Sequence, residues 1–182
     1  NSISLLSQIA RLKVDKNIQK SKEFIEQIGE KSQSMAIAMD DMLWSIDPKN
    51  DSMEKTLLRI LEFADALKSR HNAEIVIKVD EQVKELELDM KVRYEFLLIC
   101  KEALRCLVQY SNCRNLLVNI DCARSKIQLK ILSQACEVDP NSDVVYDSRK
   151  KILKRVELIN ASFDFLVNKD QTSVILAVPL RS

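Results

Sequence analysis

The chain contains a single glycine, Gly29, among its 182 residues. Average usage would place about a dozen glycines in a chain of this length. Glycine tolerates positive φ and lets backbone N–H groups approach a ligand closely. Loops that wrap phosphates depend on both properties, so the sequence argues against a P-loop, a Rossmann turn or another glycine-rich nucleotide cradle.

The composition indicates a folded domain with no strong field of its own. Hydrophobic residues make up 46% and charged residues 30%, and 28 Lys and Arg against 27 Asp and Glu leave a net charge of +1. Such a balance does not attract nucleic acid or an anionic membrane, and no apolar run approaches the roughly 18 residues of a membrane span. We therefore expect no nucleic-acid partner, no membrane contact in this chain, and a cytoplasmic location. The helical pattern at Asn1 indicates a fragment, so a membrane anchor in the parent protein stays open.

The cysteines are interpreted as structural thiols. They number five, and no Cys-x-x-Cys motif occurs among Cys100, Cys106, Cys113, Cys122 and Cys136. An odd count without paired spacing predicts neither a disulfide framework nor a zinc site. We expect reduced, mostly buried thiols and no metal site.

Residues 1–50 carry a helical pattern. Apolar residues indicate a short helix over 2–14, and steps of three or four from Ile18 to Ile46 predict a rod about 45 Å long that ends before Pro48. So narrow an apolar seam needs a partner. We predict a helical hairpin that pairs with a second copy as a four-helix bundle; the alternative is a long helix lying on its own domain.

Residues 51–182 mix helices and strands. Asp51 followed by Glu54 indicates a helix start, and the pattern then changes between periods of 3.6 and 2. The expected helices are 53–70, 91–110 and 148–161; the expected strands are 74–79, 116–121, 126–132, 162–168 and 172–179, with a short extended piece at 86–88 and a polar loop over 136–147. This order predicts an α+β two-layer sandwich.

Four short stretches resemble the sensor histidine kinases of bacterial two-component systems. They are Trp44-Ser45-Ile46-Asp47-Pro48-Lys49-Asn50-Asp51, Leu98-Ile99-Cys100-Lys101-Glu102-Ala103-Leu104, Lys154-Arg155-Val156-Glu157-Leu158-Ile159 and the closing Val174–Leu180. The resemblance covers essentially the whole chain. It implies a dimerisation hairpin with a truncated first helix in residues 1–50, followed in residues 51–182 by a sandwich of the histidine-kinase ATPase (Bergerat) type.

The same resemblance exposes departures at the implied ATP site. Glu102 is kept, but Cys106 stands where the family places an Mg²⁺-binding Asn, and a thiol is a poor ligand for a hard cation. Ser133 and Ala135 replace an adenine-reading Asp and a Gly. Ser148 stands in a lid without Gly, and Thr172 follows Gln171 where Gly-Thr is expected. Side chains of Cys106, Tyr110 and the 133–148 loop are expected to fill the cleft.

These departures lead to a degenerate histidine-kinase core as the preferred hypothesis. It would act as a dimeric signalling scaffold that docks a response regulator or a partner kinase, with no cofactor. The alternative is a divergent active kinase that binds ATP and magnesium, in which Glu102 orients an acceptor His upstream of this fragment; whether the chain is an enzyme is left undecided. The only histidine, His71, is interpreted as a surface or turn residue. A third hypothesis is a monomeric, anti-sigma-like docking protein.

Overall fold

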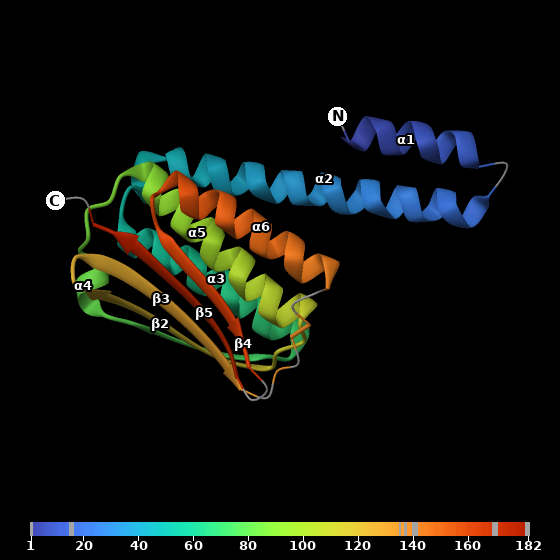
Figure 1. Cartoon of the computed structure of the whole chain (residues 1–182). Helices are drawn as coiled ribbons and strands as arrows, with labels where there is room; N and C mark the ends of the chain where they lie inside the picture. The colour runs from blue at the N-terminus through green and yellow to red at the C-terminus, as the bar shows by residue number, and fades with distance from the viewer. Residues whose placement is uncertain are drawn as a thin grey trace. The chain divides into compact units, whose positions relative to one another are not determined.

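The computed structural model describes residues 2–14, 17–134, 136, 138–139, 142–168 and 171–180. The chain divides into two compact units, residues 1–48 and 49–182. The first is helical, and the second combines helices with a five-stranded sheet (Figure 1). The predicted α+β class is therefore confirmed. Among the described residues, no helix has both the length and the apolar character needed to cross a bilayer.

The first unit is a hairpin of two helices, α1 (Ser2–Lys13) and α2 (Ile18–Ile46), packed along each other (Figure 1). Asn17 caps α2, because its side chain accepts a hydrogen bond from the Lys20 amide at 3.0 Å. Ser21 Oγ donates to the Ala10 carbonyl at 3.0 Å, and both residues are buried. The Lys13 ammonium lies 5.6 Å from the centre of the Phe24 ring, which places its charge over an aromatic face.

An apolar stripe remains exposed along α2. Its members follow the spacing of a coiled-coil seam, and each is more than half exposed: Ile18, Ile25, Met35, Met39, Met42 and Ile46. We call these six residues the α2 stripe. Gly29 lies in the same helix with no atom within 4 Å of the position that a Cβ would take, so it serves no close backbone approach.

The second unit contains one sheet with the strand order β1-β2-β3-β5-β4. Strand β1 runs parallel to β2, and the remaining neighbours are antiparallel. The strands are β1 (Glu74–Val79), β2 (Asn115–Ala123), β3 (Lys126–Gln134), β4 (Ser162–Val167) and β5 (Gln171–Pro179). Leu116 faces Ser133 across β2 and β3, and Ser133 faces Thr172 across β3 and β5, which fixes the register.

Three long helices cover one face of this sheet (Figure 1). They are α3 (Met53–His71), α5 (Met90–Arg105) and α6 (Asp143–Leu158). Alternate residues of β3 and β5 are buried, as expected for strands with one covered face. Helix α5 has the deepest position, with Phe96, Leu97 and Ile99 fully buried. The core therefore lies between α5 and the sheet.

Two local predictions were wrong, and one short helix was not predicted. Residues 86–88 lie outside any helix or strand, and the unpredicted helix, α4 (Glu81–Lys84), follows β1 and buries Val83. Helix α5 ends at Arg105 and continues as one π-helical turn, η2 (Cys106–Tyr110). Helix α6 begins at Asp143, well before the expected Ser148, because the Ser142 side chain caps it by accepting from the Val145 amide.

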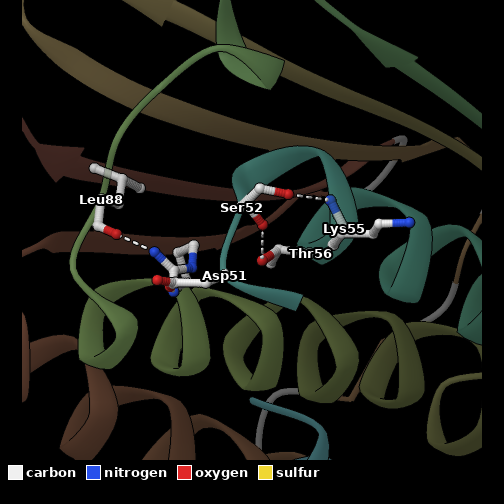
Figure 2. A network of polar contacts seen from close by, with 6 residues as sticks. Asp51, Ser52, Lys55, Thr56 and Leu88 are labelled. Carbon is white, nitrogen blue, oxygen red and sulfur yellow. Dashed lines mark hydrogen bonds and ion pairs between the residues drawn. The ribbon is translucent and has the colours of Figure 1, made fainter. Parts of the chain in front are cut away.

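The start of the second unit is held by polar contacts (Figure 2). After a 3₁₀ turn, η1 (Pro48–Asn50), the N-cap of α3 is Ser52 and not Asp51: Ser52 Oγ accepts from the Lys55 amide at 3.2 Å. The Asp51 carboxylate instead pairs with the guanidinium of Arg93, which also donates to the Leu88 carbonyl. The chain just after the Trp44–Asp51 motif is thereby attached to the first turn of α5.

Candidate functional site

Glu102 is the centre of the candidate site. It lies in the last turn of α5 and is only 8% exposed. One carboxylate oxygen accepts a hydrogen bond from Ser148 Oγ at 2.7 Å, and the other accepts one from the Arg105 guanidinium at 2.8 Å. The Lys151 ammonium is 3.7 Å from the first oxygen. The negative charge of Glu102 is therefore compensated by groups of this chain alone.

Besides the Lys151–Glu102 ion pair, two hydrogen bonds join helices α5 and α6. Besides Ser148 on Glu102, the Arg155 guanidinium donates to the Glu95 carboxylate at 2.7 Å. The partners are spaced by seven residues on each helix and in opposite directions, so the two contacts lie about 10 Å apart along an antiparallel helix pair. Glu95 and Ser148 are buried, which makes these contacts stronger than exposed ion pairs. Helix α6 is thus joined directly to α5 by side-chain contacts.

Cys106 begins the π-helical turn and is fully buried. Burial raises the pKa of its thiol to about 11, and the charge of Glu102 acts in the same direction, against a smaller opposing effect of hydrogen bonding to Ser148 and Ser111. The thiol is therefore protonated near neutral pH. A thiol in its protonated form is a poor nucleophile, and sulfur is a poor ligand for Mg²⁺.

Ser133 and Thr172 form a second group on the sheet. They are register partners on β3 and β5, and both are buried. Ser133 Oγ donates to the Asn115 carbonyl at 2.9 Å, which ties it to β2. Thr172 Oγ1 is buried without a hydrogen-bond partner. The pair therefore offers hydroxyl groups in place of the carboxylate that would read an adenine amino group.

The remaining predicted positions contribute differently. Ala135 lies outside the described residues. Tyr110 is 38% exposed and Cys106 is buried; that these side chains and the 133–148 loop fill the cleft stays a prediction. His71 ends α3 and is partly exposed, and its carbonyl accepts a hydrogen bond from Arg114.

Two of these residues differ from the ligands that Mg²⁺ prefers or already have partners. Both oxygens of Glu102 already accept hydrogen bonds, and the residue four positions on is a protonated thiol. Across the described part of the chain, no three His, Cys, Asp or Glu side chains gather as a metal site. Mg²⁺ prefers carboxylate, carbonyl and water oxygens in an octahedron; Cys106 supplies no oxygen, and the Glu102 carboxylate already accepts hydrogen bonds from Ser148 and Arg105.

The cysteine prediction was wrong for two residues. Cys113 and Cys136 form a disulfide, whereas Cys100, Cys106 and Cys122 are free. Their separation of 23 residues gave no signal in the sequence, because the strand register brings them together. Sequence reasoning also missed the Ser148–Glu102 contact, which joins residues 46 positions apart. The Arg105–Glu102 pair alone has a readable signal, the i,i+3 spacing on a helix.

Comparison with known proteins identifies the fold. No family model matches the sequence, and no curated protein matches it. The structure resembles histidine kinase AdeS of Acinetobacter baumannii with a TM-score of 0.62 and 10% identity, covering 99% of this chain and 95% of that one. It resembles the blue-light activated histidine kinase EL346 of Erythrobacter litoralis with a TM-score of 0.64 and 13% identity, covering 85% and 51%.

A third similarity is to the catalytic domain of a histidine kinase. The catalytic domain of histidine kinase ThkA matches with a TM-score of 0.52 and 9% identity, over 70% of this chain and 92% of that domain. Structural similarity at identities this low shows the fold alone. The helical hairpin, the mixed sheet and the three covering helices together show that this chain has the fold of a histidine-kinase core.

Proposed function

We propose that the chain is a degenerate histidine-kinase core that does not use ATP in the usual way and serves as a dimeric signalling scaffold. One observation carries this proposal: Glu102, the kept residue of the implied catalytic helix, is engaged by Ser148 and Arg105 of its own chain. A carboxylate that orients an acceptor group must reach it within hydrogen-bond distance. Here the Ser148 hydroxyl and the Arg105 guanidinium each donate to one oxygen of that carboxylate, which supports the proposal.

The chemistry of the neighbouring positions supports the same conclusion. Phosphoryl transfer depends on positioning and on neutralisation of charge by metal ions. Cys106 offers a protonated thiol where an oxygen ligand is required, and the only glycine lies in α2. A thiol at the implied metal position and the absence of a glycine-rich phosphate loop from the sequence both support the proposal.

The test is isothermal titration of the chain with ATP and Mg²⁺. We expect no binding at micromolar concentrations, and micromolar binding would overturn the proposal. The Ser148→Ala variant is titrated in parallel, because it removes the hydroxyl that donates a hydrogen bond to the Glu102 carboxylate. Circular dichroism of both proteins confirms that they are folded.

The alternative, a divergent active kinase, makes an opposite prediction. A longer form of the protein with an upstream acceptor His would then incorporate phosphate from ATP, and Glu102→Gln would abolish the incorporation. If ATP binds and Glu102→Gln has this effect, the active kinase replaces the scaffold.

The proposed partners are a second copy of the chain and a response regulator or partner kinase. The α2 stripe supports the second copy, because six apolar side chains at coiled-coil spacing are exposed on one helix. Residues 1–50 would form the dimer interface and residues 51–182 the docking domain. Because the net charge is only +1, we do not propose nucleic acid as a partner. We propose a cytoplasmic location.

A further inference from the structure

The disulfide pair occupies a defined place in the sheet. Leu116 on β2 faces Ser133 on β3, so three residues outward along both strands bring Cys113 opposite Cys136. Their Cα atoms are 5.0 Å apart, within the range that a disulfide requires. Both residues are buried, Cys113 to 1% exposed and Cys136 to 7%. The backbone register alone therefore places the two side chains within bonding reach.

The pair joins β3 to the turn that follows Cys106. The Cys113 amide donates to the Leu107 carbonyl of η2 at 2.8 Å, and the Ser111 amide donates to the Cys106 carbonyl at 3.0 Å. A covalent bond from Cys113 to Cys136 extends this connection to the residue just beyond β3. The oxidised pair thus attaches the end of β3 to the turn that carries Cys106.

The surroundings also accommodate the reduced pair. The sulfur of Cys136 is 3.8 Å from the Ser111 carbonyl oxygen, which gives its thiol an acceptor when the bond is broken. A buried polar group with a partner in both states carries little penalty in either. The structure pairs Cys113 with Cys136 and leaves Cys100, Cys106 and Cys122 free.

We propose that Cys113 and Cys136 form a reversible thiol–disulfide site, oxidised by a small-molecule disulfide such as oxidised glutathione. In reducing compartments, disulfides are mostly transient and redox-sensing. The inference does not depend on the scaffold function, since it concerns the chemistry of two side chains.

The exchange proceeds in two steps. Cys136, the more exposed of the two, loses a proton, and its thiolate attacks one sulfur of the small disulfide and expels one small thiolate. Cys113 then loses its proton and attacks the Cys136 sulfur of the mixed disulfide, which releases the second small thiolate. Two electrons pass from the cysteine pair to the small disulfide, and the two released thiolates take up the two protons.

The test is a redox titration of the whole chain in glutathione buffers. After equilibration, the samples are quenched with acid, free thiols are alkylated, and peptides are identified by mass spectrometry. We expect the Cys113–Cys136 link to rise from near zero to near completion as the proportion of oxidised glutathione increases, while Cys100, Cys106 and Cys122 stay alkylated. A pair that stays reduced in the most oxidising buffer, or stays linked in the most reducing one, overturns the proposal.

Two variants sharpen this titration. Cys113→Ser removes the resolving thiol, so we expect oxidation to stop at a glutathione adduct on Cys136. Cys122→Ser is the matched control, and its titration should superimpose on that of the unchanged protein. Hydrogen exchange then reports the consequence: amides at the start of β2 and the end of β3 should exchange at least threefold more slowly in the oxidised protein. Equal exchange in the two states contradicts the proposed attachment.

Discussion

Asparagine occupies several left-handed backbone positions of the kind that glycine often occupies in other chains. Among the described residues, positive φ occurs at Asn72, Asn112, Asn160, Arg124 and Ser125. Asn72 is the C-cap of α3, where its amide donates to the Lys68 carbonyl. Asparagine tolerates the left-handed region better than most residues, whereas Arg124 and Ser125 hold it only because they connect β2 to β3 in a two-residue turn.

The turn residue Ser125 offers a direct test of this strain. Ser125→Gly removes the strain of a left-handed conformation, about 1 kcal/mol. Part of this gain is lost because glycine gives the unfolded chain greater conformational freedom. We expect the free energy of unfolding to rise by about 0.5 kcal/mol in urea denaturation. Ser173→Gly makes the same chemical change in the extended strand β5, and it should lower that free energy by roughly 0.5–1 kcal/mol. Equal effects of the two substitutions would contradict the explanation.

At the scale of elements, the relation between α5 and α6 decides the character of the candidate site. Helix α5 is buried on most of its surface, and α6 reaches its polar residues through Ser148 and Arg155. Glu95 and Glu102 on α5 and Ser148 on α6 are buried at these contacts.

A double-mutant cycle measures the strength of that interface. Glu102→Ala and Ser148→Ala, alone and together, should show a coupling energy of about 1–2 kcal/mol in unfolding free energy, because a buried hydrogen bond to a charged group is lost once. The exposed pair Lys84 and Glu81, 2.7 Å apart, is the control and should couple by less than about 0.5 kcal/mol. A Glu102–Ser148 coupling as small as the control's would show that α6 is not fastened at this point.

At the scale of the whole molecule, the two units have different needs. Residues 49–182 bury a core of their own between sheet and helices, whereas residues 1–48 leave the α2 stripe exposed. A helical hairpin with an uncovered apolar seam is stabilised by pairing with another. The proposed dimerisation therefore rests on the first unit and not on the second.

Substitution within the α2 stripe should separate the copies. Met39→Lys combined with Met42→Lys places charge in the proposed seam, and we expect sedimentation velocity to show a dimer for the unchanged chain and a monomer for this variant at micromolar concentration. Leu153→Lys, at an exposed apolar position of α6, is the control and should leave the dimer intact. A monomeric unchanged chain would instead favour the docking protein that uses the sandwich alone.

The fold was largely predictable because its signals are local. The change from a 3.6-residue to a two-residue period marks each helix and strand within a few neighbouring residues. The errors arose where a single side chain outweighs the pattern: Ser142 starts α6 inside a stretch that reads as a polar loop, and Ser52 instead of Asp51 caps α3. The departures at Cys106 and Ser133 were also readable, since they are substitutions at positions in a motif.

What the sequence by itself determined is the class of fold, the scarcity of glycine and the chemistry present at each position. Only the tertiary structure decided that Ser148 donates a hydrogen bond to Glu102, that Arg93 pairs with Asp51 and that Cys113 forms a disulfide with Cys136. Helix and strand patterns repeat over three or four residues, so they are written in adjacent positions. Contacts between residues 23 to 46 positions apart depend on strand register and helix packing, which the whole core sets at once.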